Sequence, residues 1–129
     1  MREILYILPI MLLVLLFGCQ NSSGTTITEI DTKELERLLQ NEDDNHDYFF
    51  MDVREVHEYN EAHIKQMVNI PLSVLESSYE QVPNGKTVVI ICRSGSRSLQ
   101  AANLLKDLGY ENLVNVRGGM LDWDGEINN

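Results

Sequence analysis

The feature that most constrains the fold is a run of five residues, TVVII, from Thr87 to Ile91. After its first position this run holds no polar residue, so it lacks the alternation of a strand that has one face in water. A continuous apolar run is typical of a strand that is covered on both faces, as in a parallel sheet between helices. We therefore predict a buried strand from Lys86 to Cys92.

The rest of the chain alternates between strand-like and helix-like segments. Short apolar or β-branched runs predict further strands at residues 27–30, 48–53, 68–70 and 113–116. The spacing of apolar residues predicts helices at 32–40, 56–60, 74–79 and after the Cys92 loop as far as residue 108, with a last helical turn at 120–126. Strands alternating with helices indicate an α/β fold, here a single domain with a mostly parallel central sheet and helices on both faces.

Several residues give local signals for helix ends and for the core. Asp31 is expected to cap the first helix, with Glu34 completing a capping box, and Ser73 is expected to cap the third. Leu108 is expected on the buried face of its helix, and Trp123 is expected in the core.

The N-terminus has the pattern of an export signal. Ile4 to Phe17 form an apolar run broken only by Pro9, and this run is shorter than the roughly 20 residues of a membrane-spanning helix. It ends with a small residue directly before Cys19, which resembles the bacterial lipoprotein signal. That resemblance implies cleavage before Cys19 and lipid on its sulfur. An uncleaved N-terminal anchor is the alternative.

These features divide the chain into three parts. We expect a lipoprotein-type signal peptide at residues 1–18, a flexible tether at 19–26 and the folded domain at 27–129. The domain would then be anchored to the cell membrane on its outer, extracytoplasmic face.

The formal net charge of −10 restricts the partners of the domain. Charge of this sign and size argues against nucleic acid and against an anionic lipid surface as binding partners. About 110 residues remain after the signal, which is enough for one core, and we expect a monomer. If Cys19 carries lipid, Cys92 is the only thiol left, so the domain has no internal disulfide to form.

Cys92 ends the apolar strand and precedes a loop of small or basic residues: Arg93, Ser94, Gly95, Ser96 and Arg97. Ligands of parallel sheets bind beyond the carboxyl ends of strands, and such a loop before a helix can form a cradle of N–H groups for an anion. The Cys92 thiolate is the natural occupant. Lowering a thiol pKa by two units needs about 2.7 kcal/mol. A helix dipole supplies up to about 2 kcal/mol, so the loop amides and an arginine must contribute as well.

Other roles for Cys92 are less consistent with its neighbours. A core cysteine needs no polar loop after it, and a thioredoxin-like pair needs a second cysteine in a C-x-x-C motif. The three histidines show no ligand spacing, so we expect no metal and no cofactor. A cysteine phosphatase is the main alternative. Its loop has arginine six positions after the cysteine, whereas here Arg97 is five positions after and Ser98 is the sixth.

Four sequence blocks, in order, resemble the rhodanese family of sulfurtransferases in its single-domain form. They are MDVREVHEYNEAHI, VNIPL, CRSGSRS and VRGGMLDW, and they extend along nearly the whole domain. The chain departs from the family pattern at Ala62, where glycine is usual, and at residues 65–67, which replace a Pro-Gly-type turn. Ser96 stands where asparagine is frequent. None of these departures affects the cysteine itself.

The resemblance implies sulfur transfer. The Cys92 thiolate would take the sulfane sulfur of thiosulfate or of a persulfide donor and pass it to a thiol or to cyanide. The loop amides would hold the persulfide, Arg93 would attract the anionic donor, and Arg97 would support the loop. Three residues of the first block are expected to be structural: Asp52, Arg54 and His63. The alternatives are a phosphatase or arsenate reductase on the same fold, or a non-catalytic binding module.

Overall fold

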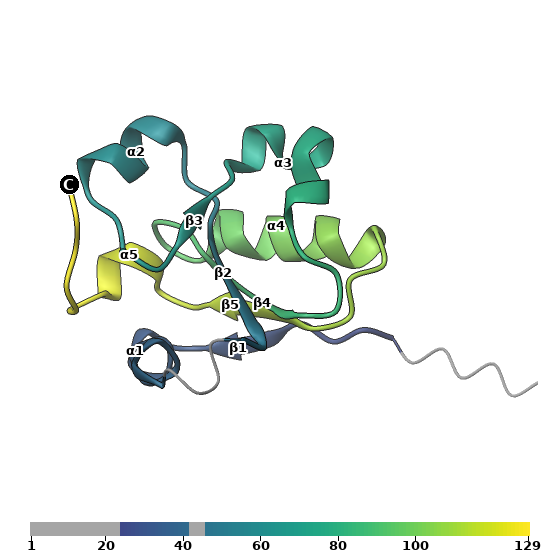
Figure 1. The fold of residues 1–129 in the computed structure, drawn as a ribbon, viewed down its shortest axis with the longest axis horizontal. Helices are drawn as coiled ribbons and strands as arrows, with labels where there is room; N and C mark the ends of the chain where they lie inside the picture. Colours follow the sequence, from purple (N-terminus) through teal and green to yellow (C-terminus); the bar gives the residue numbers. More distant parts are fainter. Residues whose placement is uncertain (1–23, 42–45) are drawn as a thin grey trace, which may run out of the picture.

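A five-stranded sheet forms the middle layer of the structure (Figure 1). The computed structural model describes residues 24–41 and 46–129. The strands are β1 (Thr28–Ile30), β2 (Tyr48–Asp52), β3 (Val68–Asn69), β4 (Thr87–Ile91) and β5 (Leu113–Val116), and their order in the sheet is β1-β5-β4-β2-β3. All four pairings between these strands are parallel. The sequence predicted a mostly parallel sheet, and the structure makes it entirely parallel.

Helices cover both faces of this sheet, as predicted. They are α1 (Thr32–Gln40), α2 (Val56–Glu61), α3 (Leu72–Ser78), α4 (Ser96–Asp107) and α5 (Gly119–Asp122), with a short 3-10 turn, η1, at Tyr79–Gln81. α3 and α4 lie above the sheet in Figure 1 and α1 lies below it. Each face has its own apolar core: Leu75 and Leu105 pack in one, and Leu35 and Leu39 in the other.

The central strand β4 contributes to both cores. Val88, Ile90 and Cys92 pack on the side of α3 and α4, while Val89 and Ile91 pack on the side of α1. All five residues are at most 1% exposed. This burial on both faces explains why the run carries no polar alternation, and it fixes the position of Cys92 at the end of the strand.

Three local expectations need correction. α3 begins at Leu72 with Pro71 as its N-cap, because the Ser73 hydroxyl binds the Glu55 carboxylate of the neighbouring helix instead. Leu108 is 39% exposed, since α4 has already ended at Asp107. Trp123 lies just after α5 and is half-buried, packing at the edge of the α1 core.

The first helix has the predicted N-cap but not the full capping box. The Asp31 carboxylate accepts a hydrogen bond from the Glu34 N–H at 2.8 Å, which caps α1 and lowers the pKa of Asp31. The Glu34 carboxylate instead pairs with Arg37, one turn further along the helix.

The predicted signal peptide, Cys19 and most of the predicted tether lie outside the described residues. Within residues 24–41 and 46–129, no helix is long and apolar enough to cross a membrane.

Candidate active site

The Cys92 loop lies at the carboxyl end of β4 and leads directly into α4. Gly95 is the N-cap of α4 and has a φ of 103°, which an L side chain rarely adopts. A Cβ atom on Gly95 would also lie 3.4 Å from the Gly118 nitrogen and 3.5 Å from the Val116 carbonyl oxygen. The loop therefore turns sharply here because glycine is present, and this turn points backbone N–H groups towards the sulfur.

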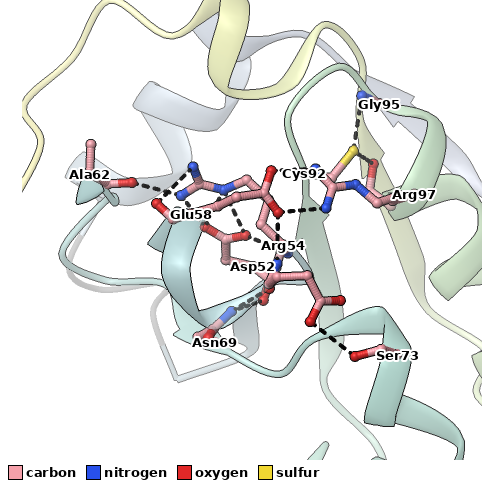
Figure 2. Close-up of polar contacts among 11 residues, drawn as sticks. Asp52, Arg54, Glu58, Ala62, Asn69, Ser73, Cys92, Gly95 and Arg97 are labelled. Carbon is pink, nitrogen blue, oxygen red and sulfur yellow. Dashed lines mark hydrogen bonds and ion pairs between the residues drawn. The ribbon is translucent and has the colours of Figure 1, made fainter. Parts of the chain in front are cut away.

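The sulfur of Cys92 lies inside this loop, within hydrogen-bonding distance of two groups. The Gly95 N–H donates to Sγ at 3.1 Å, and the Ser98 Oγ lies 3.3 Å from Sγ (Figure 2). Ser98 is completely buried and Cys92 is 1% exposed. A thiolate can only accept hydrogen bonds, so the Ser98 hydroxyl donates when the sulfur is ionised.

Burial and hydrogen bonding have opposite effects on the ionisation of Cys92. Burial raises the pKa of the thiol, because a charged sulfur loses contact with water. Hydrogen bonds from the Ser98 hydroxyl and from the N–H groups of Ser98, Gly95 and Ser94 lower the pKa, and the net result is a pKa below the ordinary value. The loop therefore favours the thiolate, the form that acts as a nucleophile.

The turn at Gly118 and Gly119 supports the loop from outside. The Met120 N–H donates to the Cys92 carbonyl at 2.9 Å, and the Leu121 N–H donates to the Arg93 carbonyl at 3.0 Å. Gly119 has a φ of 56°, and a Cβ atom there would overlap the Cys92 carbonyl oxygen and lie 2.7 Å from the Arg93 carbonyl carbon. These bonds hold the loop carbonyls away from the sulfur, which leaves its N–H groups facing inward.

Asn115 on β5 binds the same loop from the sheet side. Its side chain is buried, and its Nδ2 donates to the Gly95 carbonyl at 3.3 Å and to the Glu29 carboxylate at 3.1 Å. Its Oδ1 has no hydrogen-bond partner among the described residues. Asn115 thus links β1, β5 and the loop.

The Arg97 side chain extends from the loop to α2. Its Nη1 and Nη2 each donate to one carboxylate oxygen of Glu58 at 2.7 Å, a two-point pair that is partly buried (Figure 2). The hydrogen bonds from Arg97 lower the pKa of Glu58 to about 2. We expected Arg97 to support the loop internally. In the structure it joins the loop to a separate helix.

The other predicted cradle residues take different positions. Gly95 is at the sulfur, as described above. The side chains of Arg93, Ser94 and Ser96 are exposed at the outer side of the loop. Arg93 is therefore placed to meet a ligand that approaches from water.

Asp52 and Arg54 form a buried ion pair beneath α2. The Arg54 Nη2 donates to the Asp52 Oδ2 at 2.8 Å and to the Ala62 carbonyl at 2.8 Å. The Asn69 side chain donates to the backbone carbonyls of both Asp52 and Arg54. These contacts tie the end of β2 to α2 and β3, and so they fix the helix that carries Glu58.

His63 belongs to a separate contact at the end of α2. Its Nδ1 lies 2.8 Å from the Tyr59 carbonyl oxygen, and its ring stacks on the Tyr59 ring with centroids 3.9 Å apart. The structure therefore does not bring His63 to the sulfur. Among the described residues, no group of three His, Cys, Asp or Glu side chains is arranged to hold a metal ion.

Three residues of this site were not predicted from the sequence: Ser98, Glu58 and Asn115. Ser98 could have been suspected, because it occupies the position next to Arg97 on the first turn of the helix. Glu58 and Asn115 lie 34 and 23 residues from Cys92 in the chain, and only the packing of α2 and β5 brings them close.

A comparison with protein families agrees with this fold and this loop. The model of the rhodanese-like domain matches residues 31–126. The chain therefore belongs to the rhodanese family, which confirms the resemblance seen in the sequence.

Individual relatives include proteins named for sulfur chemistry. A sulfurtransferase of Allochromatium vinosum is 33% identical over 97 residues, which cover 75% of this chain and 88% of that protein. A Bacillus subtilis protein named for a proposed role as a sulfur carrier is 38% identical over 111 residues. This match covers 84% of the present chain but only 58% of the Bacillus protein.

Solved structures show the same fold. A rhodanese-like domain protein of Staphylococcus aureus superposes with a TM-score of 0.71 at 26% identity, covering 79% of this chain and 97% of that one. A human single-domain sulfurtransferase superposes with a TM-score of 0.63 at 28% identity, covering 76% and 96%.

Proposed function

We propose that this protein is a rhodanese-type sulfurtransferase that carries sulfur as a persulfide on Cys92. The Cys92 thiolate attacks the terminal sulfur of thiosulfate or of a persulfide donor. With thiosulfate, a sulfur–sulfur bond forms at Cys92, the sulfur–sulfur bond of the donor breaks, and sulfite leaves with the electron pair. Cyanide or an acceptor thiolate then attacks the outer sulfur, and the Cys92 thiolate is regenerated.

The observation that carries this proposal is the set of hydrogen bonds around Sγ. The Gly95 N–H and the Ser98 hydroxyl stabilise a negative charge on a sulfur that is almost completely buried. A buried thiol can be reached only by a reactive atom at the end of its donor, and a terminal sulfane sulfur meets this requirement. Arg93, exposed beside the loop, attracts the anionic donor despite the negative net charge of the protein.

The phosphatase and arsenate reductase alternative fits these contacts less well. Its arginine would have to stand at the sixth position after the cysteine, where this chain has the buried Ser98 within reach of the sulfur. The nearest arginine, Arg97, is already bound by Glu58 at both of its terminal nitrogens.

We further propose that the domain acts as a monomer outside the cytoplasmic membrane, tethered to it by lipid on Cys19. The tether and the location are proposed from residues 1–19 of the sequence alone.

The test is thiocyanate formation by the full-length chain in detergent, with thiosulfate as donor and cyanide as acceptor. We expect turnover by the natural chain and none above background by Cys92→Ser. After exposure to donor without acceptor, the Cys92-containing peptide should be heavier by one sulfur atom in the mass spectrum.

Cys19→Ser is the matched control, because it removes the other cysteine of the chain and leaves the loop intact. This variant should keep full turnover. If the Cys92 peptide never gains sulfur from thiosulfate or from an organic persulfide, the proposed reaction is wrong and a binding module is favoured.

A further inference from the structure

The two arginines of the Cys92 loop differ in whether their charge is paired: Arg97 forms an ion pair with a carboxylate and Arg93 forms none among the described residues. Arg97 is held by the Glu58 carboxylate through two hydrogen bonds of 2.7 Å. The Arg93 side chain is exposed and forms no ion pair within the described part of the chain. Of the two loop arginines in the described structure, an approaching anion therefore meets only Arg93 unpaired.

The Glu58–Arg97 pair is fixed from both sides. One carboxylate oxygen of Glu58 also accepts the Glu55 N–H at 2.9 Å, and this bond holds the side chain against the first turn of α2. The pKa of Glu58 is lowered to about 2, so its carboxylate is charged at every pH at which such a protein would be assayed. Turning Arg97 towards a ligand would break two charge-assisted bonds and leave the carboxylate partly buried without its partner.

We infer that Glu58 sets the charge of the sulfur donor, so that the site prefers singly charged donors to doubly charged ones. This inference rests on the proposed sulfur transfer. Glu58 is a positioning residue, because it acts by occupying Arg97 and not by touching the donor. With Arg97 engaged, a second negative charge on the donor finds no second unpaired arginine in the loop and is repelled by the acidic domain. Organic persulfides and thiosulfonates, which carry one charge, are the donor class that fits.

Two small donors isolate the effect of charge. Thiosulfate carries two negative charges at neutral pH. In methanethiosulfonate a methyl group replaces one oxygen, so it carries a single charge but has the same terminal sulfur and nearly the same shape. The Cys92 thiolate takes that sulfur from either donor, and sulfite leaves in the first case and methanesulfinate in the second.

The experiment compares kcat/KM for the two donors in the full-length chain, with cyanide as acceptor. In the natural chain methanethiosulfonate should be the better substrate. In Glu58→Gln, Arg97 is released, and the ratio of thiosulfate to methanethiosulfonate should rise roughly five- to tenfold, mainly through the KM for thiosulfate. The rise should shrink at high salt, which screens the released charge. Glu58→Asp keeps the carboxylate and should restore most of the original ratio.

Glu61→Gln is the matched control, because Glu61 is an exposed carboxylate on the same helix and its loss changes the net charge equally. Its donor ratio should stay within a factor of two of the natural chain. Equal ratios in Glu58→Gln and Glu61→Gln would overturn the inference while leaving sulfur transfer intact. Failure of the natural chain with both donors would instead overturn sulfur transfer itself.

A second variant covers the case in which Glu58→Gln does not fold. Arg97→Gln leaves the Glu58 carboxylate without its cation, so the thiosulfate preference should fall below that of the natural chain. An unchanged or higher preference in this variant would contradict the assigned role of Glu58.

Discussion

Among the hydrogen bonds that lower the pKa of Cys92, the one from the Ser98 hydroxyl has the largest effect. Burial opposes ionisation, and the loop amides alone must overcome it if the hydroxyl is removed. Hydrogen bonds to charged groups contribute about 1.5–3 kcal/mol, whereas those between neutral groups contribute about 1 kcal/mol. The hydrogen bond from a single hydroxyl at 3.3 Å therefore contributes enough free energy to change the fraction of thiolate at neutral pH.

Ser98→Ala should raise the pKa of Cys92 and so slow its alkylation at pH 7. A loss of about 1.4 kcal/mol leaves up to roughly tenfold less thiolate, and we expect a slowing of up to that size. The rate against pH should move to higher pH, because deprotonation now needs a lower proton concentration, and the two proteins should converge once the thiol is fully ionised in both. Iodoacetamide labelling, followed on the Cys92 peptide by mass spectrometry, measures this profile.

Ser77→Ala provides the comparison, since Ser77 is an exposed serine of α3 whose hydroxyl binds only the Val74 carbonyl of its own helix. Its profile should match that of the natural chain. An unshifted profile in Ser98→Ala would mean that the loop amides alone stabilise the thiolate.

The residues of the site differed in how well the sequence could predict them. Cys92 and the loop after it could be located, because a polar, glycine-containing segment directly after a buried strand is a local signal. The partner of Arg97 could not, because Glu58 lies 39 residues away and only the position of α2 brings the two side chains together. Arg97 was therefore expected to support the loop, although its side chain binds Glu58 of α2.

At the scale of elements, the residue patterns of β4 and α1 were sufficient to predict these elements from the sequence. The ends of the short helix α3 were harder to predict. β4 was predicted because its four residues after Thr87 are all apolar and buried, and α1 because its apolar residues and its Asp31 cap agree. The predicted start of α3 was wrong by two residues, since the competing contact of Ser73 with Glu55 comes from tertiary structure. Local signals give the element but not its ends.

The turn between β5 and α5 packs directly against the Cys92 loop and stabilises its conformation. Gly119→Ala places a methyl group against the backbone of Cys92 and Arg93, which cannot move without opening the loop. A positive φ alone costs an alanine about 1–2 kcal/mol, and the overlap adds to it, so we expect a loss of more than about 3 kcal/mol in unfolding free energy. Urea unfolding measures the loss, and alkylation of Cys92 should slow as its N–H groups turn away.

Gly85→Ala separates the conformational cost of a positive φ from the steric overlap with the loop. Gly85 has a φ of 92° but nothing within 4 Å of its would-be Cβ, so this variant carries the conformational cost without the overlap. We expect a loss of about 1–2 kcal/mol and unchanged alkylation. Equal losses in the two variants would show that the turn does not press on the loop.

At the scale of the whole molecule, the proposed lipid anchor and the charge of the domain have opposite effects on membrane binding. A net charge of −10 disfavours adsorption of the domain to anionic lipid, so the proposed attachment would have to come from the N-terminus. One acyl chain gives only marginal membrane binding, whereas two give stable anchoring. A diacylglyceryl group on Cys19 would meet this need with a single modified residue.

Intact-mass measurement of the full-length product from bacterial membranes tests this anchor. We expect a chain that has lost residues 1–18 and gained a diacylglyceryl group, and that partitions into detergent. Cys19→Ser removes the acceptor sulfur, so its chain should retain Met1 and carry no lipid, while its Cys92 chemistry is unaffected because the domain beginning at β1 is unchanged. A natural chain that keeps Met1 without lipid would contradict the lipoprotein proposal and support the uncleaved anchor, which requires only that the apolar run from Ile4 to Phe17 remains in the membrane.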